Sequence, residues 1–148
     1  MKKIIALVLA LVMALGLIAC APKQEAAPEA APEAAPAAVS EETYYYIAPL
    51  ASLEYWLAHR AGLEDACAKL GVTPKFVGDD GLDVDAMCAV IETAINDPNC
   101  AGIVMQANFA DAYEPYVKQA KEKGIAVCYQ TVDGVAGSER LCFLGTDY

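Results

Sequence analysis

The chain has 148 residues, of which 20 are acidic and 10 are basic, and its formal net charge is −10 at pH 7. This charge balance excludes nucleic acid and anionic lipid surfaces as expected partners, because both attract clustered Lys and Arg. Residues 1–43 contribute an apolar segment and an alanine-rich segment, so only the remaining part, about a hundred residues, can form a folded domain, and one domain at most.

The N-terminus has the pattern of an export signal. Met1-Lys2-Lys3 precedes an unbroken apolar run, Ile4–Ala19. The residues Leu17-Ile18-Ala19-Cys20 resemble the bacterial lipobox, in which the cysteine thiol takes a diacylglyceryl group. We therefore expect 1–19 to be a lipoprotein signal peptide and Cys20 to anchor the protein to the membrane. The alternative is an uncleaved transmembrane anchor, but the run is shorter than the roughly 20 residues that a bilayer requires.

Residues 20–43 have the composition of a tether. The sequence Glu-Ala-Ala-Pro occurs three times, starting at Glu25, Glu29 and Glu33. No large apolar side chain is available for a core, and a proline at every fourth position prevents a regular helix. We expect a disordered, extended linker.

Strand and helix patterns alternate from Tyr44 onward. We predict strands at 44–48, 74–78, 102–106, 125–130 and 141–144, and helices at 55–70, 83–96 and 109–123. Single helices between strands imply right-handed crossovers and a parallel sheet covered on both faces. The expected fold class is α/β, a three-layer open parallel sheet of the Rossmann or flavodoxin type.

Each helix carries a predicted apolar stripe. The stripes comprise Leu63, Ala66, Cys67 and Leu70 in the first helix; Val84, Met87, Cys88, Ile91 and Ile95 in the second; and Tyr113, Tyr116, Val117 and Ala120 in the third. Asp83 is placed to cap the start of the second helix, and Gly124 to end the third in a left-handed conformation.

The loops after the strands are the expected ligand site, because open parallel sheets bind ligands at the carboxyl ends of their strands. These loops are residues 49–56, 79–83, 106–111, 131–140 and 145–148. They contain no Gly-rich phosphate loop, no Ser-His-Asp set and no His-rich metal site, so we expect no cofactor, no metal and no catalysis. The single histidine, His59, lies inside the first helix.

Five cysteines follow Cys20, and none forms a Cys-x-x-Cys pair. Cys67 and Cys88 lie on helix stripes, and Cys128 and Cys142 lie inside strands. We expect small buried hydrophobic residues rather than disulfides or metal ligands. Unpaired thiols in an exported protein suggest a reducing habitat.

The pair Tyr55-Trp56 is the best candidate for ligand contact. Aromatic rings at the mouth of a cleft stack on the C–H face of a sugar, while carboxylates and amides bind its hydroxyls. Asn108, Asp133 and Asp147 are candidates for the polar contacts. Two alternatives remain open: Trp56 can pack in the core instead, and the polar residues can cap helices or fix turns.

At these loops the chain resembles the sugar-type class I periplasmic binding proteins, the solute receptors of ABC importers related to the ribose-binding protein. The resemblance covers Tyr44–Tyr148 and is carried by the order and spacing of four segments: Glu54–Gly62, Gly102–Asn108, Lys123–Val127 and Arg140–Asp147.

The resemblance implies roles for particular residues. Tyr55 and Trp56 match the aromatic pair that sandwiches the sugar, although the Asn-Pro that often precedes it is Leu53-Glu54 here. Thr131 stands where the family commonly has a sugar-binding aspartate, and Asp133 lies two residues later. Gly145-Thr146-Asp147 matches the closing Gly-Thr-Asp.

The resemblance also implies a monomeric receptor with two lobes, of which this chain contains an N-terminal fragment, 44–148. Such a receptor captures a sugar and delivers it to an ABC permease. A sensor lobe for chemotaxis or for a histidine kinase is a variant, and an exported α/β enzyme is the third possibility. One lobe alone is expected to bind sugar weakly or undetectably.

Overall fold

The computed structural model describes residues 40–145. The predictions for the signal peptide, Cys20, most of the tether, and Thr146–Tyr148 lie outside these residues. The described chain contains five strands: β1 (Thr43–Pro49), β2 (Thr73–Asp79), β3 (Cys100–Met105), β4 (Ala126–Gln130) and β5 (Cys142–Leu144). A 3-10 turn η1 (Glu54–Trp56) precedes the helices α2 (Leu57–Leu70), α3 (Val84–Ile95) and α4 (Ala110–Glu122).

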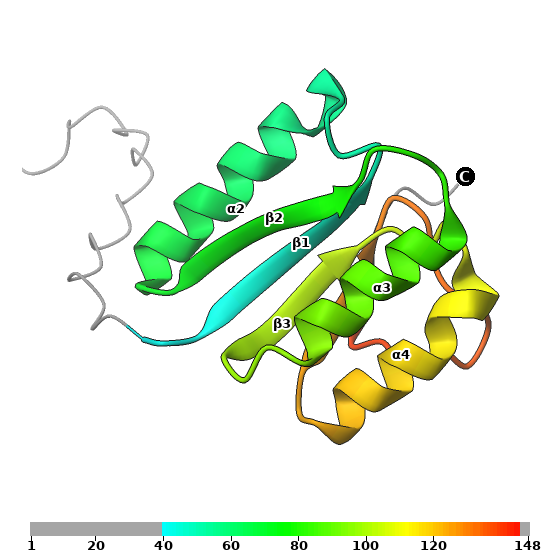
Figure 1. Cartoon of the computed structure of the whole chain (residues 1–148). Coiled ribbons are helices and arrows are strands. Elements are labelled where there is room, and N and C mark those ends of the chain that lie inside the picture. The colour runs from blue at the N-terminus through cyan, green and yellow to red at the C-terminus, as the bar shows by residue number, and fades with distance from the viewer. Residues whose placement is uncertain (1–39, 146–148) are drawn as a thin grey trace, which may run out of the picture. The chain divides into compact units, whose positions relative to one another are not determined.

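The strands form one sheet in the order β2-β1-β3-β4-β5, and every neighbouring pair is parallel. Helix α2 covers one face of the sheet, and α3 and α4 cover the other (Figure 1). The predicted fold class, a three-layer α/β parallel sheet, is confirmed. The strand order changes direction at β1, which is the kind of place where open sheets of this type bind ligands.

The main core lies between the sheet and the pair α3 and α4. Its largest fully buried side chains are Ile47, Met87, Ile91, Ile103, Met105, Tyr113, Val117 and Tyr129. The predicted stripes of the second and third helices are therefore confirmed as core faces. A smaller cluster on the other face joins Tyr46, Ala48 and Trp56, with Leu63 packed against it.

The stripe predicted for the first helix is only partly correct. Cys67 is its one buried member, Leu63 is half-buried, and Leu70 is 62% exposed. The reason is that α2 packs mainly along β2 and β1, and none of the other helices in residues 40–145 lies on that face (Figure 1). A helix that packs on two strands without a neighbouring helix buries a narrow line of side chains.

The predicted helix ends are confirmed. The Asp83 carboxylate accepts a hydrogen bond of 2.8 Å from the Ala86 N–H, as a residue before a helix does. Gly71 (φ 69°) and Gly124 (φ 78°) follow α2 and α4 in the left-handed conformation. Among the described residues, none of the helices has the length and apolarity that crossing a membrane requires.

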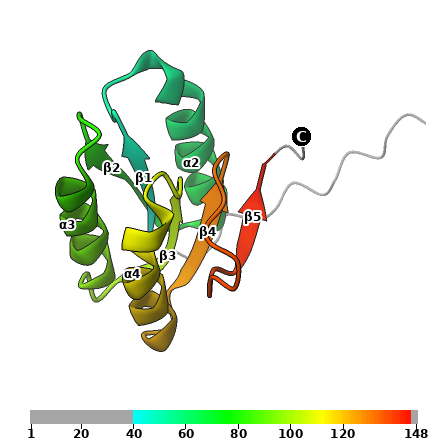
Figure 2. The same cartoon turned by 90° about the vertical axis from the view of Figure 1, so that its right-hand side faces the viewer.

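The connection from β4 to β5 contains no helix, although the two strands are parallel. Residues 131–141 pass beside both strands (Figure 2, orange to red). Hydrogen bonds hold this loop at each end: the Thr131 N–H donates to the Leu144 carbonyl (2.9 Å), and the Leu141 N–H donates to the Val127 carbonyl (2.7 Å). The loop is thus held close to the strands that it connects.

Candidate functional site: the carboxyl edge of the sheet

The carboxyl ends of all five strands lie along one edge, because every strand pair is parallel. Backbone hydrogen bonds tie neighbouring loops together on this edge. The Ala51 N–H donates to the Asp79 carbonyl (3.0 Å), and the Ala107 N–H donates to the Val132 carbonyl (3.1 Å). The loops that carry Tyr55, Asn108 and Thr131 all follow the carboxyl ends of strands and lie on this edge, which we call the carboxyl rim.

The two residues of the aromatic pair have different environments. Tyr55 is 57% exposed, whereas Trp56 is 4% exposed and packs in the smaller core cluster. The Trp56 indole N–H donates to the Pro49 carbonyl at 2.9 Å. Of the two alternatives for Trp56, the structure shows the core residue. Tyr55 is the ring that the rim presents to solvent.

Other rings surround Tyr55. Its ring centroid lies 4.7 Å from that of Trp56, edge to face, and 5.2 Å from that of His59. The rings of Trp56 and His59 are themselves 5.2 Å apart. His59 therefore belongs to an aromatic cluster at the start of α2, and this cluster limits how far the Tyr55 ring can move.

A pocket of about 500 Å³ lies beside this cluster. Its lining includes Trp56, Arg60 and Asp80. The Asp80 carboxylate accepts hydrogen bonds from the Ser52 N–H (3.0 Å) and from the Ser52 hydroxyl. The Arg60 guanidinium lies 4.5 Å from the centroid of the Phe76 ring. The pocket thus combines aromatic walls with one charge of each sign.

Asn108 lies at the rim between β3 and α4 and is exposed. It lines a second pocket, of about 540 Å³, together with Leu82, Phe109 and Asp111. Sequence analysis predicted a polar contact at Asn108, and the structure leaves its amide accessible from solvent.

Thr131 follows β4 directly and has a positive φ of 64°, which is strained for a β-branched residue. Its hydroxyl donates to the Gln130 side-chain oxygen at 3.0 Å. The amide nitrogen of Gln130 is buried and has no hydrogen-bond partner among the described residues. Sequence analysis missed Gln130; the signal was an amide at the end of an otherwise apolar strand.

Asp133 is engaged in an ion pair. Arg140 donates from Nη2 to Asp133 Oδ2 at 2.6 Å and from Nε to Oδ1, and the Gly134 N–H donates to Oδ1 at 2.8 Å. The Arg140 hydrogen bonds hold the pKa of Asp133 below its usual range. These three hydrogen bonds occupy most of the acceptor capacity of the carboxylate. The main contact of Asp133 is therefore the Arg140 ion pair, which fixes loop 131–141. Sequence analysis did not single out Arg140.

The rim offers an exposed ring with hydroxyl and amide groups, which is the chemistry of polyol recognition. Tyr55, Asn108 and Thr131 each lie on this rim. Trp56 lies beneath it, Asp133 lies in the loop that leaves it, and Asp147 lies outside the described residues. Within residues 40–145, no group of three His, Cys, Asp or Glu side chains could hold a metal ion.

Comparisons with known proteins identify the family. The family described as periplasmic binding protein domain matches residues 44–148. Among solved structures, an arabinose-binding protein from Geobacillus stearothermophilus is 28% identical with a TM-score of 0.64 and aligns over 70% of this chain and 35% of its own. A sugar-binding protein of a sugar ABC transporter from Bacillus halodurans is 31% identical with a TM-score of 0.61. It aligns over 72% of this chain and 36% of its own.

A third match is the XylFII-LytSN complex, at 25% identity and a TM-score of 0.67, over 73% of this chain and 39% of the matched one. No curated protein sequence matches. The coverages of 35%, 36% and 39% mean that the chain spans little more than a third of the length of these three structures. The sequence match over residues 44–148 and the parallel five-stranded sheet agree, and the chain belongs to the periplasmic binding proteins, with the fold of the sugar-binding members of ABC transporters.

Proposed function

We propose that the chain is the N-terminal sugar-binding lobe of an extracytoplasmic lipoprotein that captures a sugar and delivers it to an ABC import permease. The family match over residues 44–148 is the observation that carries this proposal. The role is non-catalytic. Binding would stabilise the closed arrangement of two lobes, and this arrangement would be what the permease recognises.

In this proposal the sugar lies on the carboxyl rim. The Tyr55 ring stacks on the C–H face of the sugar, supported from below by Trp56 and His59. Asn108 and Thr131 provide an amide and a hydroxyl for the sugar hydroxyls. The Gln130 side-chain oxygen accepts a hydrogen bond from the Thr131 hydroxyl and so acts through Thr131. Asp133 would act through the Arg140 ion pair by holding the loop that begins at Thr131, and Asp147 remains a proposed contact from the sequence.

One lobe supplies only one side of such a site. The chain covers 35% and 36% of the two sugar-binding relatives, so we propose that a second lobe provides the remaining contacts. A ligand that is held from one side loses much of the buried surface that gives affinity. Sugar binding to this chain alone should therefore be weak, with a dissociation constant in the millimolar range.

Trp56, the single tryptophan of the chain, provides a test of the ring contact. A sugar that stacks on Tyr55 changes the surroundings of the indole, whose ring centroid is 4.7 Å away. We expect at least one sugar in a panel of arabinose, xylose, ribose, glucose and galactose to change the fluorescence emission of Trp56 in a saturable way. Tyr55→Phe should keep this change, because it keeps the ring, and Tyr55→Ala should reduce the affinity at least fivefold.

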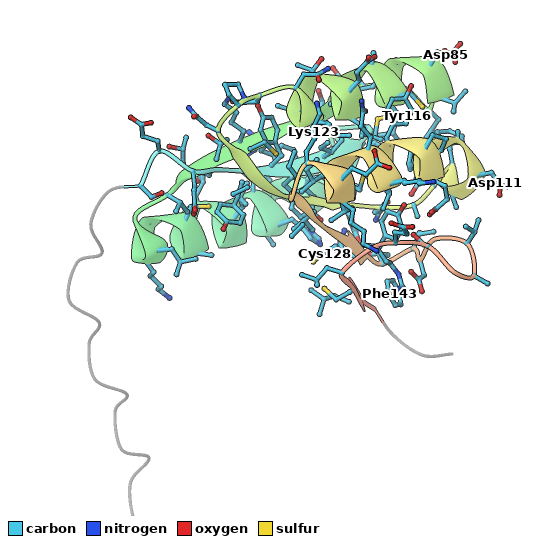
Figure 3. The ribbon with its side chains drawn as sticks, turned by 90° about the horizontal axis from the view of Figure 1, so that it is seen from below. Asp85, Asp111, Tyr116, Lys123, Cys128 and Phe143 are labelled. Atoms are coloured by element: carbon cyan, nitrogen blue, oxygen red, sulfur yellow. The ribbon has the colours of Figure 1, made fainter. Side chains whose placement is uncertain are left out.

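Tyr116→Ala is the matched control, since this half-buried tyrosine lies on α4 (Figure 3). A response that survives Tyr55→Ala unchanged would contradict the stacking role of Tyr55.

The membrane anchor is a separate proposal. We expect Cys20 to carry the lipid after removal of residues 1–19, with residues 20–43 as the tether. The support is the lipobox-like sequence. Metabolic labelling with a clickable fatty acid should mark the wild-type chain and not Cys20→Ala. Equal incorporation into both proteins would contradict a lipid on this cysteine.

A sensing role is the second candidate, favoured by one observation. One of the matched structures is a complex of XylFII with LytSN, so this fold also assembles with a second protein. The genomic neighbourhood distinguishes the two roles: adjacent permease and ATPase genes favour import, and an adjacent sensor gene without them favours signalling.

A further inference from the structure

Cys128 and Cys142 are an isolated pair of thiols in contact. They are register partners on the neighbouring parallel strands β4 and β5. Their sulfur atoms lie 2.9 Å apart, and both side chains are half-buried. Figure 3 labels Cys128 on β4 near Phe143, which is the residue after Cys142 on β5.

The backbone places the two residues at a distance that a disulfide can bridge. Neighbouring strands lie about 4.8 Å apart, and the Cα atoms of bonded cysteines are usually about 4.4 to 6.8 Å apart. The sulfur atoms must approach to about 2.05 Å, which is a small movement from their present contact.

The other thiols of the described chain have no such neighbour. Cys67 and Cys100 are buried, and the sulfur atoms of Cys88 and Cys100 lie 4.0 and 3.9 Å from the backbone carbonyls of Ala112 and Gly102. The expectation of buried hydrophobic cysteines fits Cys67 and Cys100. It does not describe Cys128 and Cys142, because strand register brings their sulfur atoms together, and register is not visible in the sequence.

We propose that Cys128 and Cys142 form a reversible redox site that closes to a disulfide by exchange with a low-molecular-weight disulfide. One thiol loses its proton and attacks a sulfur of the small disulfide, which releases one small thiol. The second cysteine then attacks the mixed disulfide and releases the other small thiol. Two protein thiols are oxidised, and one small disulfide is reduced to two thiols.

The rate of this exchange should rise with pH, because the thiolate is the attacking form. Burial, together with the neighbouring Cys142, raises the pKa of Cys128 to about 11. The titratable and charged groups near the pair also include the Arg140 guanidinium, whose pKa is raised mainly by its hydrogen bond to Asp133 and to a smaller degree by Cys142. Attack by the Cys128 thiol is therefore slow at neutral pH and faster under alkaline conditions.

The bond would have a structural consequence. It would close the loop 131–141, which carries Thr131 and the Asp133–Arg140 ion pair. It would also tie β5, a three-residue strand at the edge of the described sheet, to its neighbour. The disulfide should restrain this loop more than its hydrogen bonds and ion pair do alone, whether or not the rim binds a sugar.

Trypsin provides a direct test on the full chain. Cleavage after Lys123 and Arg140 places the two cysteines in separate peptides, 124–140 and 141–148. The protein is equilibrated with oxidised glutathione at pH 8.5, alkylated and digested without reductant. We expect one linked species of these two peptides, which dithiothreitol separates, and a melting temperature raised by roughly 10 °C.

Variants establish selectivity. Cys128→Ser and Cys142→Ser should each abolish the linked species and the rise in melting temperature. Cys88→Ser, a half-buried cysteine on α3, is the matched control and should keep both. Full alkylation of Cys128 and Cys142 in the oxidised wild-type chain, or a linked peptide that contains other cysteines, would overturn the proposal. The wild-type peptide map decides the question even if a variant fails to fold.

Discussion

Among the individual residues, Asp97 makes a dense set of polar contacts away from the rim. Its Oδ2 accepts hydrogen bonds from the Tyr45 hydroxyl (2.6 Å) and from Lys75 Nζ (2.7 Å), and its Oδ1 accepts one from the Asn99 N–H (2.9 Å). These contacts join the segment after α3 to β1 and β2. The Lys75 hydrogen bond, followed by that of Tyr45, holds the pKa of Asp97 well below its usual range.

This shift predicts a pH-dependent contribution to stability. The carboxylate has a lower pKa in the folded than in the unfolded chain, where it is about 3.9. The stabilisation is therefore present above about pH 4 and is lost as the pH falls toward the folded-state pKa. Asp97→Asn should lower the urea midpoint at pH 7, and its difference from wild type should shrink between pH 4 and pH 2.

The matched control for this prediction is Asp85→Asn, an exposed carboxylate in the first turn of α3. It should change the urea midpoint less at pH 7. A deficit for Asp97→Asn that stays constant from pH 7 to pH 2 would contradict the account of Asp97.

Single residues also show where sequence analysis stops. Composition and position predicted Tyr55 at a ligand loop, and the structure exposes its ring. The sequence left open whether the adjacent Trp56 packs in the core. The structure shows that it does, because neighbouring residues in the 3-10 turn point in different directions. The Asp133–Arg140 pair could not be predicted, since it depends on the path of an irregular loop.

At the scale of helices and strands, prediction succeeded because two signals agree. The spacing of apolar residues gives the type of each element, and Gly, Pro and capping residues mark its ends. All five strands and three helices occur where they were expected, with bounds that differ by a few residues. Asp83 and Gly124 were predicted as helix ends, because local hydrogen bonding and backbone conformation depend on residue type, which a sequence displays directly. Helix α2 is the exception, since the width of its buried face depends on which elements share that side of the sheet.

At the scale of the whole molecule, the parallel sheet gathers the candidate residues on one edge. Strand order, and with it the change of direction at β1, is a long-range property that the sequence implied only through the family resemblance. The chain covers little more than a third of the length of its solved relatives. This coverage fits our proposal of one lobe with a one-sided sugar surface.

Chemical-shift mapping of the ¹⁵N-labelled chain during titration with sugars tests this central claim most directly. For at least one sugar, we predict saturable shifts at millimolar concentrations that gather at Tyr55, Asn108, Thr131 and their rim neighbours. Amides at the opposite edge, such as those of Asp97 and Lys123, should stay unchanged. Shifts at that opposite edge alone, no shift with any sugar at 50 mM, or micromolar affinity from this chain by itself would contradict the account.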